Sequence, residues 1–438
     1  MIFLDSAATT PVRREVLEAM WPYLTGDFGN PSSHHELGES AKRALDAARK
    51  SVAAVMGCRA SDVVFTSGGT ESDNLAIKGL ALAEPRGRHI VTSAIEHEAV
   101  LESVDYLKRI HGFDVSVVPV DSAGFVDLQQ VREALRPDTT LCTIMYANNE
   151  VGVVQPIAAI AELCREHSVP MHTDAVQAAG WLALDLVELG VDALSLSGHK
   201  LGAPKGIGVL IVKGRRSLEP VLHGGGQERG KRSGTENVAG AVGFAHALAL
   251  AESDRVERAE HTARLRDNFV ADVMTRVPDA IFTGPALLAG HALAADSGSG
   301  ADADARADTD ARAVTDAAAE TGAGTNPPTS TRPTSTRPTS TPPISSRLPN
   351  NASFCFPGTS GESLLLELGR AGIICSAGSA CAVGSDDVSH VLTALGIEEE
   401  SAQTAVRFSL SGDTTAEQLA TVAAEIETAY RAVRSLSG

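Results

Sequence analysis

Positive charge is scarce in this sequence relative to negative charge. Its 438 residues include 37 Lys and Arg against 55 Asp and Glu, which gives a formal net charge of -18 at pH 7. A surface with such an excess of carboxylates repels phosphate backbones and anionic lipid headgroups. We therefore expect small molecules or proteins as partners, and neither nucleic acid nor a membrane.

Long hydrophobic runs are also missing. The longest apolar stretch, from Ala239 to Ala251, is interrupted by His246 and is much shorter than the ~20 residues that a membrane span needs. The chain begins MIFLDSAATTPVRR, which puts Asp5 where a signal peptide would carry its apolar core. These features predict a cytoplasmic protein.

The six cysteines lack the spacing of a metal site. They form no Cys-x-x-Cys pair and no Cys/His cluster at zinc spacing, so we expect no resident metal and free thiols in a reducing compartment. Cys381 lies in the small-residue stretch SAGSAC, where an open loop would let a thiol move between a buried site and an external acceptor. The other five are expected to be inert core residues: Cys58, Cys142, Cys164, Cys355 and Cys375.

Between about residue 60 and residue 212, short β-branched runs alternate with stretches of helical periodicity, which predicts an α/β fold with a large, mainly parallel seven-stranded sheet. Apolar spacing predicts a helix between Leu17 and Met56, and an Ala-rich helix over Val238–Val273. The expected strands are Val63–Thr66, His89–Thr92, Val115–Val120, Thr140–Met145, Met171–Thr173, Ala193–Ser197 and Gly208–Val212.

The length of the chain exceeds what one hydrophobic core usually supports, so we expect two domains. Residues 287–346 lack hydrophobic periodicity and include PTSTR-PTSTR-PTSTP, which predicts a disordered insert. A solvated spacer is the simpler interpretation of it, and an extended partner-binding segment is the alternative. The segment NASFCFPG with ESLLLELGRAGI predicts a strand, a turn and a helix of a smaller α+β domain. The expected division is 1–14 joining the small domain, 15–260 as the large domain, and 261–286 with 347–438 as the small domain.

The segment VVFTSGGTESDNLAIKG places a glycine turn between a strand and a helix. Free backbone amides and the positive end of the helix dipole make such a junction an anion site, to which Thr70 can add a hydroxyl. A glycine turn that only caps the helix has the same pattern.

In HTDAVQ, Asp174 and Gln177 follow the strand at Met171, where ligands bind in open α/β sheets. A carboxylate there can keep a pyridine nitrogen protonated, although a helix N-cap would also explain Asp174.

In SLSGHKLGAPKGIGVL, Lys200 lies between an apolar strand and small residues. An isolated lysine is usually a surface charge, but desolvation here would lower its pKa and suit a Schiff-base amine. Ser197 and His199 flank it as candidate phosphate donors. The anion site, the ring-facing carboxylate and the lysine together match the needs of pyridoxal phosphate. The sequence has neither a GxxxxGK[ST] loop nor a strand–GxGxxG–helix unit for a nucleotide.

Motifs spread over nearly the whole chain point to one family: LDSAATTPV, GNPSSHH, TSGGTESDN, IEHEAV, ANNEVGVVQPI, HTDAVQ, SGHKLGAPKGIG, GGGQERGKRSGTEN, LPNNASF, SAGSAC and VRFSLS. In this set and order they resemble the cysteine desulfurases of the NifS/IscS type, which belong to the class-V aminotransferase family and to fold type I of the pyridoxal-phosphate enzymes. Only the insert lacks a counterpart. The resemblance implies an aspartate-aminotransferase-like α/β fold.

The resemblance also implies a role for each matching residue. Lys200 is similar to the lysine that binds the cofactor, and Asp174 to the partner of the ring nitrogen. Gln177 is similar to the group that bonds the ring oxygen, and His97 to the histidine that stacks on the ring and assists proton transfer. The phosphate would be held by Gly69, Thr70, Ser197 and His199, with Thr235 reaching in from the second subunit of a homodimer.

For the substrate, Asn149 resembles the side chain near the ring, and Arg407 resembles the guanidinium that clamps the carboxylate. A planar guanidinium binds a carboxylate bidentately, whereas a surface or ion-paired arginine is the alternative for Arg407. The family's activity would convert L-cysteine to L-alanine, with the sulfur held as a persulfide on Cys381. The sulfur would pass to an iron-sulfur cluster scaffold, where the persulfide could contact a cluster, or to another thiol acceptor.

Two other functions stay open from the sequence. One is a different pyridoxal-phosphate enzyme of the same fold type, such as a selenocysteine lyase or a small-amino-acid aminotransferase; SAGSAC argues against the aminotransferase. The other is a non-catalytic partner in sulfur assembly that keeps the fold. The joint presence of Lys200, Asp174, His97 and Cys381 argues against it.

Overall fold

The computed structural model describes residues 1–83, 85–287, 346–378 and 388–436. The insert expected over 287–346 therefore lies outside the described residues, apart from its two end residues. All of the described residues belong to one compact unit. None of the helices in these ranges has the length and apolar character needed to cross a membrane.

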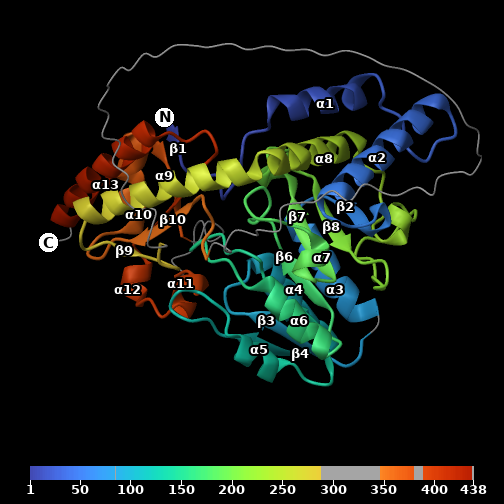
Figure 1. Ribbon diagram of the computed structural model, residues 1–438, viewed down its shortest axis with the longest axis horizontal. Helices are drawn as coiled ribbons and strands as arrows, with labels where there is room; N and C mark the ends of the chain where they lie inside the picture. Colours follow the sequence, from blue (N-terminus) through green and yellow to red (C-terminus); the bar gives the residue numbers. More distant parts are fainter. Residues whose placement is uncertain (84, 288–345, 379–387, 437–438) are drawn as a thin grey trace, which may run out of the picture. The chain divides into compact units, whose positions relative to one another are not determined.

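A seven-stranded sheet with the order β2-β8-β7-β6-β5-β3-β4 forms the centre of the larger half of the molecule (Figure 1). Only β8 runs antiparallel to its neighbours β2 and β7, while all the other pairs are parallel. The predicted mainly parallel seven-stranded α/β sheet is therefore confirmed. Its strands are β2 (Val63–Thr66), β3 (His89–Ser93), β4 (Asp114–Val118), β5 (Thr139–Thr143), β6 (Met171–Asp174), β7 (Ala193–Ser197) and β8 (Gly208–Val212).

Helices cover both faces of this sheet, and successive residues of a strand enter different cores. On β2, Val63 and Phe65 pack into one core, while Val64 packs into the other with α3 and α4. This alternation accounts for the continuous apolar runs of the strands. The helices of this half are α1 (Arg14–Thr25), α2 (Glu36–Val55), α3 (Gly69–Ala83), α4 (Glu98–His111), α5 (Leu128–Ala134), α6 (Ile157–Glu166), α7 (Leu186–Leu189) and α8 (Val238–Ser253).

A four-stranded antiparallel sheet, in the order β12-β13-β10-β9, has a core of its own in which the rings of Phe269, Phe354 and Phe408 pack edge to face. The start of the chain joins this region, since β1 (Ile2–Phe3) pairs in parallel with β11 (Ile373–Ile374). The remaining strands are β9 (Ile281–Phe282), β10 (Asn351–Cys355), β12 (Ser376–Ala377) and β13 (Ala405–Ser409). The helices are α9 (Arg255–Arg276), α10 (Gly361–Arg370), α11 (His390–Ala394), α12 (Glu399–Ala402) and α13 (Ala416–Leu436).

Two helix predictions need correction. The region between Leu17 and Met56 holds two helices rather than one, because residues 26–35 leave the helical path. The His35 ring caps the start of α2 by accepting the Gly38 N–H at 3.2 Å. The helix expected over 238–273 is also interrupted: Asp254, with φ -112° and ψ 7°, separates α8 from α9. The sequence itself signals the first break, since residues 26–35, GDFGNPSSHH, are rich in turn residues.

A buried ion pair ties the loop after β8 to the sheet. The Glu228 carboxylate accepts two bonds from the Arg49 guanidinium, each of 2.7 Å, and a third from the Phe65 N–H at 3.2 Å. Both charged side chains are at least nine-tenths buried. In a low-dielectric interior, removal of either partner would leave the other as an uncompensated buried charge.

We expect Glu228→Ala to lower the free energy of unfolding by about 3–5 kcal/mol, because it leaves the Arg49 charge buried without a partner. Urea denaturation would measure the loss. Glu18→Ala is the matched control, since it breaks an exposed i,i+4 pair with Arg14 and should cost less than about 1 kcal/mol. Equal losses in the two variants would contradict this account.

Candidate active site

Asp174 ends β6, which lies between β5 and β7 in the sheet. Its side chain is buried, and Oδ1 accepts the Val176 N–H at 2.8 Å. Burial raises the pKa of Asp174, while the positive charges of His97 and Lys200 and the bond from Val176 lower it. The structure therefore brings Asp174, His97 and Lys200 within electrostatic reach of one another. No helix begins directly after Asp174, so a helix N-cap does not explain its position.

His97 has a second role as the N-cap of α4, because its Nδ1 accepts the Ala99 N–H at 3.0 Å. Lys200 follows β7 in a short 3-10 turn. Its Nζ donates to the carbonyl oxygens of Ala7 and Ala8, the latter at 2.7 Å. Gln177 Nε2 donates to the same Ala7 oxygen at 3.0 Å, so Gln177 and Lys200 meet at the N-terminal segment.

The predicted phosphate site joins the start of α3 to the end of β7. A Cβ on Gly69 would lie 3.0 Å from Val176 Cγ2 and 3.4 Å from the Ser197 Cβ, so a larger residue would crowd this junction. Thr70 follows in the first turn of α3 and is exposed. Gly69, Thr70 and Ser197 therefore surround one helix N-terminus, where backbone N–H groups suit an anion.

His199 is the fourth predicted phosphate ligand, and its Nδ1 lies 3.2 Å from Thr9 Oγ1. Burial lowers the pKa of His199 to about 4, with further lowering by Lys200 and Lys205. The ring is therefore neutral at pH 7 and can serve an anion as a hydrogen-bond donor, not as a cation.

Thr235, the fifth predicted phosphate ligand, is exposed on the loop that follows β8. Among the described residues, no hydrogen bond joins it to Gly69 or Ser197. The same loop is held to α3 by a contact that the sequence analysis missed. Arg232 Nε donates to Glu71 Oε1 at 2.8 Å, and the second Glu71 oxygen accepts the Ser67 N–H at 2.7 Å.

Arg407 lies on β13 and is 1% exposed. Its guanidinium donates to the Asn149 carbonyl and to Asp5 Oδ1, each at 3.0 Å, while Nε has no hydrogen-bond partner among the described residues. Asn149 and Arg407 are thus brought together, as the predicted substrate roles require. The ion pair with Asp5, 402 residues away, was not foreseen.

Cys381 and the rest of residues 379–387 lie outside the described residues, so the sulfur-carrying role of this thiol stays a prediction. Burial raises the pKa of three other thiols to about 12: Cys58, Cys355 and Cys375. Cys142 and Cys164 are buried. These five thiols are protonated at pH 7 or shielded from solvent, which makes them poor nucleophiles.

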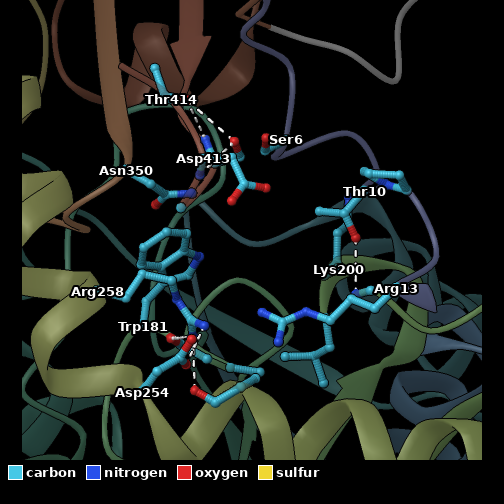
Figure 2. Close-up of a pocket in the computed structure, with 18 of the residues that line it drawn as sticks. Ser6, Thr10, Arg13, Trp181, Lys200, Asp254, Arg258, Asn350, Asp413 and Thr414 are labelled. Carbon is cyan, nitrogen blue, oxygen red and sulfur yellow. Dashed lines mark hydrogen bonds and ion pairs between the residues drawn. The ribbon is translucent and has the colours of Figure 1, made fainter. Parts of the chain in front are cut away.

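A cavity of about 660 Å³ opens beside Lys200, and Figure 2 shows Ser6, Thr10, Arg13 and Arg258 around it. Gln177 also lines this cavity, but Asp174, His97 and Gly69 do not. It therefore adjoins the predicted cofactor site without coinciding with it. The site itself fits pyridoxal phosphate on its own features, which are a buried carboxylate, a neighbouring lysine and a glycine junction with little room for a side chain.

Further polar residues below Asp174 escaped the sequence analysis. Asp73, Glu96 and His172 are all buried, and the first two interact electrostatically with Asp174. His172 could have been found, because it lies two residues before Asp174 on one strand and so shares its face of the sheet. Asp73 gave a weaker signal, one turn into the helix that begins at Gly69.

Known proteins resemble this chain over most of its length. The family model of class-V aminotransferases matches residues 2–291. A cysteine desulfurase IscS of Dictyoglomus turgidum is 39% identical and the alignment covers 100% of this chain and 96% of that protein. A putative cysteine desulfurase of Bacillus subtilis, IscS 1, is 41% identical, with 97% of each covered.

Solved structures of similar proteins also superpose on this chain over most of its length. A NifS-like protein superposes with a TM-score of 0.79 at 34% identity, covering 98% of both chains. SspA, solved in complex with cysteine, superposes with a TM-score of 0.70 at 33% identity, covering 94% of this chain and 99% of its own.

We expect Glu96→Gln to change how stability depends on pH. Glu96 Oε1 accepts the Ser93 hydroxyl at 2.5 Å and the Met145 N–H at 2.9 Å, and burial raises the pKa of Glu96 from 4.5 to about 8. The folded protein therefore keeps a proton that the unfolded chain releases above pH 4.5, so this residue's contribution to stability is lost as the pH rises towards 8. Urea unfolding at about pH 5 and about pH 9 should show a smaller loss in Glu96→Gln than in the wild type.

The exposed neighbour Glu98 supplies the control. Glu98→Gln should keep the pH dependence of the wild type. An unchanged slope in Glu96→Gln would mean that Glu96 is ionised in the folded protein across this range.

Proposed function

The chain belongs to the class-V aminotransferase family as one of its cysteine desulfurases, and we propose that it converts L-cysteine to L-alanine with the sulfur held as a persulfide on Cys381. The observation that carries this proposal is the meeting of Asp174, Lys200 and His97 at one buried point of the sheet edge. A carboxylate, an amine and an imidazole in this arrangement match the groups that pyridoxal-phosphate chemistry on an amino acid needs.

When bound, pyridoxal phosphate supplies a conjugated ring that takes up the electron pair of the substrate α-carbon. Asp174 would keep the ring nitrogen protonated, and Gln177 would bond the ring oxygen. The phosphate ligands are Gly69, Thr70, Ser197 and His199, with Thr235 from a second copy of the chain. Support for this set comes from the Gly69–Ser197 junction and from the Gln177–Lys200 meeting at Ala7.

The substrate carboxylate is the natural partner for the Arg407 guanidinium, whose buried Nε has no acceptor among the described residues. Asn149, bonded to Arg407 through its carbonyl, lies beside that position. Lys200 Nζ removes the α-proton, and His97 assists later proton transfer. Both groups interact electrostatically with Asp174, which supports their action at a shared site.

Sulfur leaves the substrate by attack of the Cys381 thiolate. A bond forms between the two sulfur atoms while the substrate's carbon–sulfur bond breaks, and the carbon skeleton departs as alanine after protonation. The outer sulfur then passes to an iron-sulfur scaffold or another thiol acceptor in the cytoplasm.

The domain division belongs to the same proposal: 1–14 with the small domain, 15–260 as the large domain, and 261–286 with 347–438 as the small domain. The pairing of β1 with β11 supports the first part of it. The separate aromatic core around Phe269 and Phe408 supports the last part, because a domain is expected to have its own core.

A homodimer is the proposed assembly, and α1 supplies its clearest surface. One side of α1 packs on α8, as Figure 1 shows, whereas four large apolar side chains of this region are more than half exposed. These are Leu17, Trp21 and Leu24 on α1, at helical spacing of four and three, and Phe28 in the segment that follows the helix. A second copy of the chain would cover this stripe and bring its own Thr235 to the phosphate site.

Substitution at two residues tests the activity. Lys200→Ala should lose the visible absorption band of the lysine-bound cofactor and fall at least about a thousandfold in alanine production, because the amine that removes the α-proton is gone. Cys381→Ser should keep the band and lose cysteine-dependent sulfide release. Spectra, alanine assays and sulfide assays of the purified variants would measure these effects.

The outcomes separate the rival activities. Persulfide and alanine formation at the normal rate in Cys381→Ser would refute the nucleophile assignment. Transamination of a keto acid without sulfide release by the wild type would refute the desulfurase activity itself, and a colourless wild-type protein would favour a non-catalytic role.

The dimer has its own test. Trp21→Glu with Leu24→Glu should shift the mass measured by light scattering from dimer to monomer, and should weaken cofactor binding because the second copy's Thr235 is lost. Glu15→Gln, on the same helix, is the control and should stay dimeric. A double variant that stays dimeric would show that α1 lies outside the interface.

A further inference from the structure

A layer of buried polar side chains lies beneath Asp174 in the sheet. His172 precedes Asp174 by two residues on β6, so both side chains project from the same face. The His172 ring bridges the neighbouring strands: Nδ1 lies 2.9 Å from Thr143 Oγ1 of β5, and Nε2 lies 2.9 Å from Ser195 Oγ of β7. One imidazole thus links three central strands and is 0% exposed.

Asp73 brings α3 to the same layer. Its Oδ1 is 3.7 Å from His172 Nε2, its carboxyl is hydrogen-bonded by the Ser195 side chain, and the residue is 1% exposed. Because α3 begins at Gly69, the helix that forms the proposed phosphate site also carries Asp73 into the sheet. Asp73, Ser195 and His172 therefore connect the phosphate end of the site to the strand that ends in Asp174.

Burial affects which of the side chains around Asp174 carry a charge. The groups that face Asp174 are the carboxyls of Asp73 and Glu96 and the basic side chains of His97 and Lys200. Burial, followed by the charge of Asp174, raises the pKa of Asp73 well above its usual value. Burial also lowers the pKa of His172 to about 3. Near pH 7 His172 is therefore neutral, and burial favours the protonated form of Asp73.

This layer does not have the composition of a metal site. Within the described residues, no group of three or more His, Cys, Asp or Glu side chains could hold a metal ion. A neutral hydrogen-bonded layer would instead leave the negative charge of Asp174 without a competing cation beneath it. If His172 became charged, an imidazolium would lie under Asp174 and compete with the cofactor's ring nitrogen for its negative charge.

We propose that Asp73 and His172 are positioning residues that form a neutral support for Asp174, so that its charge is reserved for the ring nitrogen of the cofactor. The inference rests on the proposed function, because it gives Asp174 that partner. Asp73 acts by filling the space beside Ser195 and His172 with a protonated carboxyl, which keeps water away from the imidazole. Without it, hydration of the ring would favour the imidazolium.

Two variants at Asp73 and one at Ser195 test this proposal. Asp73→Asn keeps the volume and the neutral charge and should behave as the wild type. Asp73→Ala should weaken the binding of pyridoxal phosphate to the apo-protein about tenfold, and should lower the pH midpoint of the visible absorption band by about half a unit or more. The pH midpoint falls because an added positive charge on His172 would favour loss of the proton from the Lys200–cofactor linkage. Ser195→Ala removes only the hydroxyl and should shift both values in the same direction.

A matched control separates this effect from ordinary loss of stability. Thr173 is buried on the same strand but projects from the opposite face, so Thr173→Ala should leave the midpoint and the cofactor affinity unchanged. Wild-type values in both Asp73→Ala and Ser195→Ala would overturn the proposal. Impairment of Asp73→Asn equal to that of Asp73→Ala would also overturn it, since the ionised carboxylate would then be what matters. If the wild type forms a visible band and Lys200→Ala does not, these results bear on the layer alone and leave the proposed function standing.

Discussion

A carboxylate removed from water is the constraint on which this active site depends. Asp174 ends a central strand, where neighbouring strands and helices exclude solvent, and its Oδ1 is bonded by the Val176 N–H. A buried charge of this kind is stable only with opposite charges close by. His97 follows β3 and Lys200 follows β7, so the two basic side chains approach from the carboxyl ends of other strands in the same sheet. The parallel order of the strands brings these ends to one edge.

The N-terminal segment joins the two sheets around that edge. Asp5 pairs with Arg407 of the small sheet, while the Ala7 carbonyl accepts bonds from Lys200 and Gln177 of the large one. The Thr10 hydroxyl adds a bond to the His199 carbonyl at 2.8 Å. A short stretch of chain thus contacts both the residues proposed to bind the cofactor and those proposed to bind the substrate. Because its partners lie up to 402 residues away, the site is complete only when the two ends of the chain have met.

The sequence was informative where the physical cause is local. Each of the seven strands was predicted to within two residues, because a buried β-branched run between polar turns is typical of a strand. The break at residues 26–35 was missed although its sequence, GDFGNPSSHH, is rich in turn residues. The motif order predicted site roles for Lys200, Asp174 and His97, but it did not predict Asp5 as the partner of Arg407, because a contact across the whole chain leaves no local pattern. Asp73 was hidden in a helix whose glycine turn drew attention to its first residues alone.

Some of the buried polar atoms without a hydrogen-bond partner lie where the function is proposed. Among the described residues, buried atoms without a hydrogen bond include Arg407 Nε, Glu96 Oε2 and Asp73 Oδ1. Each such atom costs about 1–3 kcal/mol, so a sequence selected for stability alone would have removed them. Two of these residues face Asp174, and the third is the proposed carboxylate clamp. A ligand that brings a cation to Asp174 and a carboxylate to Arg407 would satisfy part of this deficit, and its binding would then stabilise the fold by linkage. Of these three atoms, Arg407 Nε is the one that the proposed substrate carboxylate would pair.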